Sequence, residues 1–314
     1  MKLAIIGCGK IARLHAVCMQ NAGFNISCVS GRQGKSKSVD DFADEFGVKN
    51  KFDNSFDLIN HSEWDALLIT CPTQFALSYL KASADKKKPI LVEKPITYDY
   101  QRLEEFLKYD NICVGLNRRF YKSVLFTKKF VINNDSIFIR VNIPESVNET
   151  DFDVNFTIPK RSYENSIHMF DLLNFISGNV SWIHTHKIMN NENLKAIIAT
   201  GKSDKNITIQ ICHYFNSSDN FSIDVTSNEK RVLLKPIEVA EFYEGMNIIE
   251  PNEKIRIRSY SPKLVERIYE ESEFKPGFID QSYSFMNFCN NIEDSKLAKI
   301  TDIHKALKLI EELK

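Results

Sequence analysis

The hydrophobic pattern of the first 120 residues predicts strands and helices in alternation. Short apolar runs rich in β-branched residues, which suit strands covered on both faces, precede longer amphipathic stretches that suit helices. Because strands joined through helices run parallel with right-handed crossovers, this alternation predicts a doubly wound α/β domain. The expected strands are 2–6, 25–30, 64–70, 89–92 and 112–115, and the expected helices lie near 10–22, 36–46, 73–87 and 99–109.

The pattern changes after residue 118. A helix near 120–132 leads to segments in which apolar and polar residues alternate with period two, which is typical of a sheet covered on one face. Helical patterns near 279–291 and 302–313 close the chain. We therefore expect a first domain over 1–118 and an α+β domain with a mostly antiparallel sheet over 119–314. The alternating segments are SIFIRVNI (136–143), NITIQICHYF (206–215), FSIDVTS (221–227) and EKIRIRS (253–259).

The segment IIGCGKIA (5–12) joins the first strand to the first helix. Gly7 and Gly9 permit a tight turn and a close approach of a ligand to the backbone, and Ala12 lets the helix pack close to the strand. Free N–H groups at the start of such a helix attract anions. The spacing G-x-G-x-x-A therefore predicts dinucleotide binding, and a plain strand–helix turn with two glycines is the alternative. The expected contacts are Gly7, Cys8, Gly9, Lys10 and Ile11.

The end of the second expected strand bears on the choice of cofactor. A carboxylate at this point would bind the ribose hydroxyls of NAD. The chain has Ser30-Gly31-Arg32 instead, with Lys35 and Lys37 beyond. A hydroxyl and a guanidinium suit a 2′-phosphate, so Ser30 and Arg32 favour NADP over NAD. The alternative is that the basic residues are the solvated start of a helix.

Composition narrows the classes of partner. Lys+Arg and Asp+Glu both number 41, so the net charge is zero and nothing favours a nucleic acid or a membrane surface. The seven cysteines are scattered without a C-x-x-C pair, which suits a reducing compartment and gives no metal site. The first residues have the pattern of a core strand rather than a leader, and no apolar run approaches the roughly 20 residues of a membrane span. We therefore expect a cytoplasmic protein.

The stretch KKKPILVEKP (86–95) combines an apolar strand with a charged end. Lys94 follows the strand at its carboxyl end, where ligands bind in open α/β sheets. Held between Glu93 and a proline, this lysine is placed to donate a hydrogen bond to a substrate oxygen. The alternative is a solvated lysine in a loop.

The stretch RSYENSIHMFDLLNFISG (161–178) predicts a largely buried helix that ends at Gly178. Glu164, His168 and Asp171 are spaced i, i+4 and i+7, which places them on one helix face. Titratable groups on a buried helix need partners or a cleft. The alternative is a core histidine whose hydrogen bonds are satisfied by Asp171 or a backbone carbonyl.

Taken together, five segments resemble the Gfo/Idh/MocA oxidoreductase family: AIIGCGKIARLHA (4–16), CPTQFALSYLKASADKKKPILVEKP (71–95), VGLNRRF (114–120), ENSIHMFDLLNFISG (164–178) and KITDIHKALKLIEEL (299–313). The resemblance implies a Rossmann cofactor domain. It also implies that Lys94 contacts nicotinamide ribose and substrate, and that His168 is the acid/base, assisted by Glu164. Further cofactor contacts are expected at Cys71, Pro72 and Glu93, and substrate contacts at Asn117, Arg118 and Asn165.

Two positions depart from the family pattern. The family often has Asp where this chain has Glu164, and Ala76 replaces a histidine that is common after the third strand of the first domain. Both departures weaken any inference from the substrates of the family to the substrate of this chain.

These observations predict an NAD(P)-dependent oxidoreductase that acts on a hydroxyl or ketone of a sugar or sugar derivative. A nucleotide sugar is one candidate, because the basic run Lys160-Arg161 could meet a pyrophosphate. The resemblance further implies a homodimer or homotetramer, formed through the open face of the antiparallel sheet. The alternatives are a non-catalytic NAD(P) or sugar sensor on the same fold, and a lyase or glycosidase-type reaction with transient oxidation.

Overall fold

The computed structural model describes residues 1–31, 37–61, 63–152, 157–191 and 193–314. Its contacts divide the chain into two compact units. Unit 1 comprises Met1–Phe120 and Ser272–Lys308, and unit 2 comprises Tyr121–Glu271 and Leu309–Lys314. The sequence predicted one boundary near residue 118 with all later residues in the second domain. The structure instead groups residues 272–308 with unit 1.

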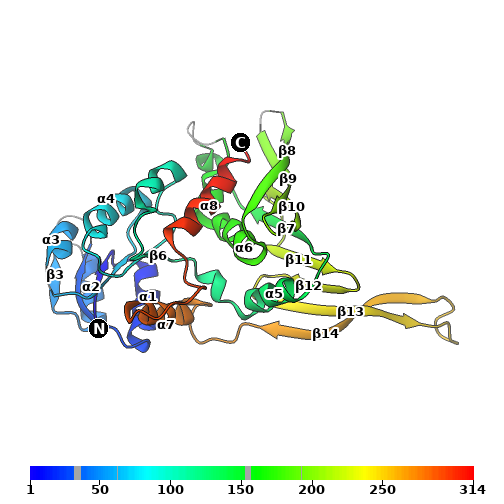
Figure 1. The fold of residues 1–314 in the computed structure, drawn as a ribbon, viewed down its shortest axis with the longest axis horizontal. Helices are drawn as coiled ribbons and strands as arrows, with labels where there is room; N and C mark the ends of the chain where they lie inside the picture. The colour runs from blue at the N-terminus through cyan, green and yellow to red at the C-terminus, as the bar shows by residue number, and fades with distance from the viewer. Residues whose placement is uncertain (32–36, 62, 153–156, 192) are drawn as a thin grey trace. The chain divides into compact units, whose positions relative to one another are not determined.

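Unit 1 is built on a parallel sheet that has six strands in the described residues, in the order β3-β2-β1-β4-β5-β6. Figure 1 labels the two edge strands of this sheet, β3 and β6. All neighbouring strands pair in parallel, which confirms the predicted doubly wound α/β fold. The strands are β1 (Lys2–Ile6), β2 (Asn25–Ser30), β3 (Asn50–Phe52), β4 (Ala66–Ile69), β5 (Ile90–Val92) and β6 (Ile112–Val114). The helices that follow them are α1 (Lys10–Asn21), α2 (Lys37–Phe46), α3 (Ser55–Asn60), α4 (Thr73–Ala84) and two 3₁₀ helices, η1 (Tyr100–Phe106) and η2 (Asn117–Phe120).

The later helix α7 (Phe278–Cys289) joins unit 1 through its apolar face. It packs on α1, and the ring of Phe285 stacks on Phe24 at 5.7 Å between centroids. Phe285 and Leu297 belong to the same buried cluster as the apolar residues of β1 and α1. This burial explains why residues far along the chain belong to the first unit. α8 (Ile300–Glu311) follows.

Unit 2 contains a sheet with eight strands in the described residues, in the order β14-β13-β12-β11-β7-β10-β9-β8. Only the pair β7–β10 is parallel, so the predicted mostly antiparallel sheet is confirmed. The strands are β7 (Phe138–Glu145), β8 (Val180–Asn190), β9 (Asn193–Ser203), β10 (Thr208–Phe215), β11 (Ser222–Ser227), β12 (Lys230–Leu234), β13 (Val239–Ile249) and β14 (Ser259–Tyr269). The other described elements are α5 (Lys122–Asn133), a 3₁₀ turn η3 (Glu149–Asp151), a π-helical turn (Ser162–Ser166) and α6 (Ile167–Ser177).

One predicted strand is wrong. Residues 253–259 lie in the connection between β13 and β14, and only Ser259 belongs to a strand. The alternation of isoleucine and arginine has the pattern of a strand, but Ile257 is 71% exposed and is not buried against a core. An alternating pattern forms a strand only where the segment can pair with a neighbouring strand and bury its apolar face against a core.

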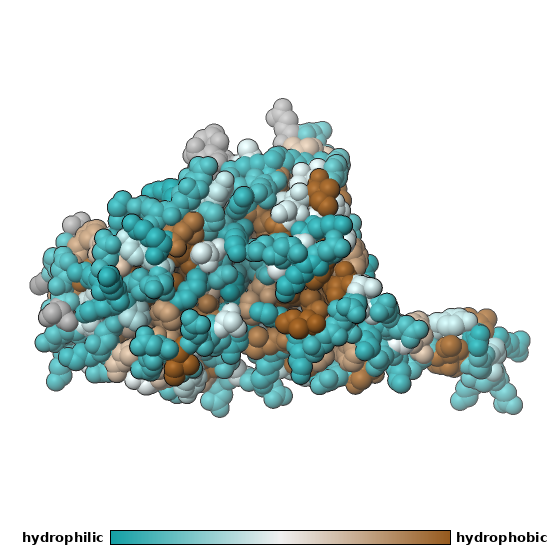
Figure 2. All heavy atoms as spheres, viewed as in Figure 1, coloured by the Kyte–Doolittle hydropathy of each residue, from teal (hydrophilic) through white to brown (hydrophobic). Residues whose placement is uncertain are grey.

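The distal part of β13 and β14 forms a two-stranded ribbon within unit 2. β12 pairs with β13 only as far as Glu244, so beyond that residue β13 pairs with β14 alone. Figure 2 shows apolar side chains among polar ones on this ribbon. One face of the ribbon carries the pairs Met246–Pro262 and Ile248–Tyr260, and the other carries Asn247–Ser261.

Candidate active site

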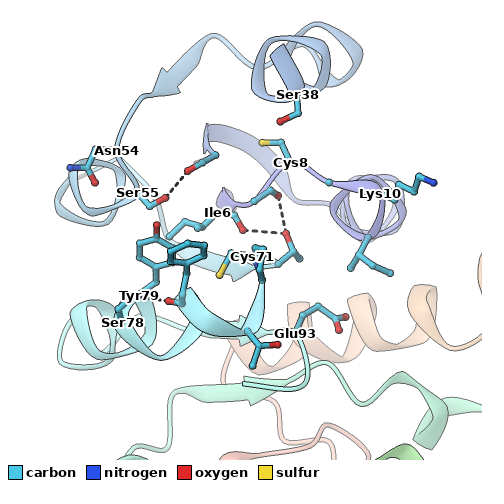
Figure 3. Close-up of a pocket in the computed structure, with 18 of the residues that line it drawn as sticks. Ile6, Cys8, Lys10, Ser38, Asn54, Ser55, Cys71, Ser78, Tyr79 and Glu93 are labelled. Atoms are coloured by element: carbon cyan, nitrogen blue, oxygen red, sulfur yellow. Dashed lines mark hydrogen bonds between the residues drawn. The ribbon is translucent and has the colours of Figure 1, made fainter. Parts of the chain in front are cut away.

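A pocket of about 980 Å³ lies in unit 1 beside the carboxyl ends of the central parallel strands (Figure 3). This is the edge at which ligands bind in doubly wound sheets. Its walls come from residues 6–11, 54–56, 70–73 and 93–94, together with Gly31, Ser38, Phe75, Ser78 and Tyr79. The structure thus brings together the predicted cofactor residues Gly7, Cys8, Gly9, Lys10, Ile11, Cys71, Pro72, Glu93 and Lys94.

The two glycines of the turn have different roles. Gly7 has a φ of +96°, and a Cβ there would lie 2.9 Å from the backbone of Thr70 and Cys71. The Thr70 hydroxyl closes the turn by donating to the Gly7 carbonyl at 2.8 Å. Gly9 has nothing within 4 Å of the position of a Cβ, so it leaves open space. The backbone conformation and close contacts at position 7 require a glycine. Gly9 instead leaves space in the pocket, because it has no side chain.

The N-terminus of α1 follows directly and is suited to an anion. Gly9 is its N-cap, in an extended conformation, and no side chain caps the first turn. The Arg13 guanidinium donates to the Cys8 carbonyl at 2.9 Å, which holds the turn from behind. Uncapped N–H groups and the helix dipole together favour a phosphate at this point.

The thiols in the pocket wall are not nucleophiles. Burial raises the pKa of Cys8 to about 12, although Arg13 acts in the opposite direction, and burial raises the pKa of Cys71 to about 12. Both side chains are therefore protonated at neutral pH and act as small apolar groups.

At the far end of β2 the structure places Ser30 differently from the prediction. Ser30 is fully buried, its hydroxyl is 2.9 Å from that of Ser55, and it is absent from the pocket wall. Ser55 lines the pocket in its place and lies 3.3 Å from the Gly31 carbonyl (Figure 3). Arg32 and Lys35 lie outside the described residues. Among the described residues that line this end, none is a carboxylate.

The opposite end of the pocket is formed by the residues after β5. Glu93 and Lys94 line it, as the position after a parallel strand predicts. A Glu93 carboxylate oxygen accepts the Lys94 backbone N–H at 3.1 Å. The Lys94–Pro95 peptide bond is cis.

Two predicted substrate residues in unit 1 lie elsewhere. Asn117 is 5% exposed, and its side-chain amide donates to the Pro276 carbonyl at 2.9 Å. Its amide therefore ties η2 to the segment before α7. Neither Asn117 nor the half-buried Arg118 is part of the pocket wall.

The remaining predicted catalytic residues belong to unit 2. His168, 4% exposed, lies in the first turn of α6, and Gly178 ends this helix as predicted. Glu164 lies in the π-helical turn, where its carboxylate is 3.3 Å from the Lys160 ammonium group. Because the π turn changes the residue spacing, the predicted stripe of Glu164, His168 and Asp171 does not follow from α-helical spacing alone. That Lys94 of unit 1 and these residues meet at one substrate stays a prediction.

The π turn is held by several side chains of unit 2. Ser162 is 2.7 Å from Nε2 of the buried His213, and the Tyr163 hydroxyl donates to Glu311 at 2.6 Å. Asn165 and Ser166 both donate to Glu145, which is 5% exposed. The turn before His168 is therefore fixed by hydrogen bonds rather than by apolar packing alone.

Sequence reasoning missed the residues that line the pocket beyond β3. Asn54 caps α3 by accepting the Phe56 N–H at 2.9 Å, and the rings of Phe56 and Tyr79 are 5.2 Å apart. An asparagine before Ser55-Phe56 is a helix-start signal that could have revealed α3. The aromatic pair carries no local signal, because its members are far apart in the chain.

Among the residues that the structure describes, no group of three His, Cys, Asp or Glu side chains is arranged to hold a metal ion. In the same part of the chain, no helix combines the length and the apolar character needed to cross a membrane.

The fold and the pocket define a Rossmann-type dinucleotide-binding domain. Comparison with known proteins makes this more specific: residues 1–111 match the model of the oxidoreductase family with an NAD-binding Rossmann fold, Gfo/Idh/MocA. Residues 1–111 thus match the NAD-binding Rossmann domain of that family.

Relatives span parts or all of the chain. The uncharacterized oxidoreductase YrbE of Bacillus subtilis is 29% identical over 188 residues, which cover 55% of this chain and 53% of YrbE. Glucose-6-phosphate 3-dehydrogenase of the same organism is 28% identical over 43% of this chain and 39% of that enzyme. The matched region is thus about half of each relative or less. Over the whole chain, the fold is similar to scyllo-inositol dehydrogenase of Lactobacillus casei, solved with NAD(H) and scyllo-inositol: the TM-score is 0.72 at 17% identity, covering 100% of this chain and 96% of that one.

Proposed function

We propose that this protein is an NAD(P)-dependent oxidoreductase that transfers a hydride between nicotinamide and a hydroxyl or ketone of a sugar-like substrate. The observation that carries the proposal is the pocket of unit 1, which joins an anion site at the glycine turn to Lys94 at the end of β5. The glucose-6-phosphate and scyllo-inositol dehydrogenases among the similar proteins support a polyhydroxylated substrate.

The residues of the pocket fit a dinucleotide. The open space beside Gly9 and the uncapped start of α1 suit a pyrophosphate, which needs N–H donors and no intervening side chain. Lys94 and Glu93 would hold the nicotinamide end. When bound, the cofactor supplies the hydride acceptor or donor.

The protein's own residues then handle the substrate oxygen and its proton. In the oxidative direction, the Lys94 ammonium group donates a hydrogen bond to the reacting oxygen and stabilises its developing negative charge. The imidazole of His168 takes the hydroxyl proton, a role for which an imidazole is suited near neutral pH. Asn165, in the turn before His168, is proposed to contact the substrate.

Glu164 is proposed to assist His168 as a carboxylate that orients the ring. Its ion pair with Lys160 supports an orienting role, because the contact with the ammonium group restricts the direction of the carboxylate. In the basic run Lys160-Arg161, Lys160 is thus already paired with Glu164. The exposed Arg161 is therefore the residue of this run that favours the pyrophosphate of a nucleotide sugar.

NADP is the proposed cofactor, with NAD as the alternative. Support comes from the Ser55 hydroxyl and from the lack of a carboxylate among the described residues at the Gly31 end of the pocket, since NAD-specific sites place an acidic residue there. Arg32 would add a guanidinium to this end.

We also propose a cytoplasmic homodimer or homotetramer that associates through the open face of the unit 2 sheet. Phe138 and Tyr214, both half-buried, lie on adjacent strands among polar residues. Arg140 and Arg231 both pair with the single carboxylate of Asp224 on a neighbouring strand, so one of the two positive charges there is neutralised.

The function is tested by a ligand-stabilisation screen followed by kinetics. NAD, NADP, sugars and nucleotide sugars are screened by thermal shift, and turnover is measured on the substrate that binds. Lys94→Ala and His168→Ala should each leave cofactor binding largely intact, because most cofactor contacts lie elsewhere in the pocket, and lose about 10²- to 10⁴-fold in kcat, the usual contribution of general acid–base catalysis. Wild-type kcat in both variants would refute the assignment. Binding without turnover by the wild type would identify the protein as a sensor instead.

A further inference from the structure

A histidine and a carboxylate form a buried hydrogen-bonded pair behind the pocket of unit 1. His15, on α1, is fully buried, and its Nε2 atom is 2.6 Å from a carboxylate oxygen of Glu93. The other carboxylate oxygen of Glu93 accepts the backbone N–H of Lys94 at 3.1 Å. One carboxylate thus connects a histidine of the first helix to the backbone of the lysine that lines the pocket.

The surroundings of the pair hold both partners in one arrangement. Gly115, after β6, makes room for the carboxylate, because a Cβ there would lie 2.7 Å from the Glu93 oxygen that contacts His15. On its other side, the His15 ring lies against Phe278 of α7, with 4.6 Å between ring centroids. Nδ1 of His15 has no hydrogen-bond partner among the described residues, so the ring makes its polar contact with Glu93.

The charges around the carboxylate explain why it needs this partner. Burial raises the pKa of Glu93, but the hydrogen bond and charge of His15, the charge of Lys94 and its backbone N–H together outweigh burial and bring the pKa below its ordinary value. Lys275, in the segment before α7, has its ammonium group 4.8 Å from the centre of the Phe278 ring. Without His15, a carboxylate that is only 13% exposed would lose its main stabilising contact.

We propose that His15 is a positioning residue, which holds Glu93 so that its carboxylate fixes the backbone of Lys94 at the end of β5. The effect on turnover rests on the proposed role of Lys94. The effect on the carboxylate does not, so the two can be judged separately.

A purely structural role for His15 makes a different prediction. If the ring only fills space against Phe278, a phenylalanine of similar volume should replace it without changing Glu93. If the hydrogen bond is what matters, glutamine should replace it, because its amide can reach the position of Nε2 and donate. Comparing His15→Phe with His15→Gln therefore separates shape from hydrogen bonding.

The first measurement uses the unliganded protein. The carboxyl carbon of Glu93 is followed by ¹³C NMR from pH 3 to pH 8, and its signal is assigned with Glu93→Gln. We expect the pKa of Glu93 to rise by at least about one unit in His15→Phe and to rise less in His15→Gln, which keeps the hydrogen bond but not the charge. His304→Phe is the matched control, because it removes a histidine ring that packs on Tyr100 in the same unit and is distant in sequence from Glu93. An unchanged Glu93 titration in His15→Phe would overturn the proposal.

If His15→Phe does not fold, His15→Asn replaces it. The shorter amide does not reach the carboxylate, so the same upward shift is expected, and an unchanged titration again counts against the proposal.

The second measurement tests the consequence for Lys94. The acid limb of the pH profile of kcat/KM should move to higher pH in His15→Phe and move less in His15→Gln, while His304→Phe leaves it in place. A shifted carboxyl titration with an unmoved pH profile would show that Glu93 is held by His15 but does not act through Lys94, which overturns the positioning role. If the wild type turns over no sugar substrate, the proposed function fails, and the NMR result still decides the contact between His15 and Glu93.

Discussion

The two glycines of the first turn should respond in opposite ways to substitution. Gly7 has a φ of +96° and would bring a Cβ to 2.9 Å from the backbone of the β4 end. A left-handed backbone costs a residue with a side chain about 1–2 kcal/mol, and overpacking against a backbone that cannot move away adds about 1–3 kcal/mol. Gly7→Ala should therefore lower the free energy of unfolding by about 2–5 kcal/mol. For a unit of this size, that corresponds to a decrease in Tm of about 5–15 °C.

Gly9→Val should instead preserve the fold and remove cofactor binding. Gly9 has φ −85° and ψ −170°, a conformation that suits a β-branched residue, and its Cβ would meet nothing within 4 Å. The loss of a glycine N-cap costs at most about 1 kcal/mol, so Tm should fall by no more than about 3 °C. The new methyl groups occupy the open side of the turn, where a pyrophosphate has to approach the helix N-terminus.

Differential scanning fluorimetry with and without cofactor measures both effects. At a cofactor concentration of about 100 times Kd, binding stabilises the wild type by about 2.7 kcal/mol, which corresponds to a shift of several degrees. That shift should be absent in Gly9→Val and reduced in Gly9→Ala, which places a single methyl group at the same point. A Gly9→Val protein with a wild-type cofactor shift, or a Gly7→Ala protein with wild-type Tm, would refute the reasoning.

Three further outcomes are expected. In titration calorimetry, the wild-type protein should bind NADP more tightly than NAD, and a preference for NAD would contradict the prediction. Arg32→Ala should reduce the ratio of the two affinities by about ten- to a hundredfold, because it removes a charge-assisted contact to phosphate. Burial lowers the pKa of His213 to about 4 from an ordinary 6.5, so the fold favours its neutral form; that stability is complete above pH 6.5 and is lost as the pH falls toward 4. In denaturant unfolding, the free energy of unfolding of the wild type should fall by about 3 kcal/mol between pH 6.5 and pH 4, and that of His213→Phe should not. An equal pH dependence in the two proteins would contradict the role of His213. Light scattering at micromolar concentration should give a dimer or tetramer, and a monomer would exclude the proposed assembly.

The glycine turn and the strand before Lys94 were predictable because each feature is local. An apolar strand, two glycines and a helix are adjacent in residues 2–21, and the physics of a tight turn requires them in that order. The same holds for the strand that precedes Lys94. By contrast, β3 and α3 are three and six residues long, too short for a periodic pattern to distinguish them from a loop.

Side-chain direction and distant contacts were not predictable in the same way. In a strand buried on both faces, such as β2, apolar residues fill both sides, so the pattern does not show which way Ser30 points. It contacts Ser55, 25 residues later, rather than the pocket. The contact between His15 and Glu93 joins residues 78 apart, and it depends on the sheet order, in which β4 lies between β1 and β5.

The helix of His168 shows how a correct element can still mislead about a site. Its apolar periodicity predicts a buried helix ending at Gly178, and the structure confirms that end. The spacing from Glu164 to His168 assumes 100° per residue, but residues 162–166 form a π turn, in which more residues occupy each turn. The turn is anchored by Glu145 through Asn165 and Ser166, and by the buried His213 through Ser162. Because these contacts come from β7 and β10, the direction of Glu164 is set by the sheet, and its pairing with Lys160 follows from that.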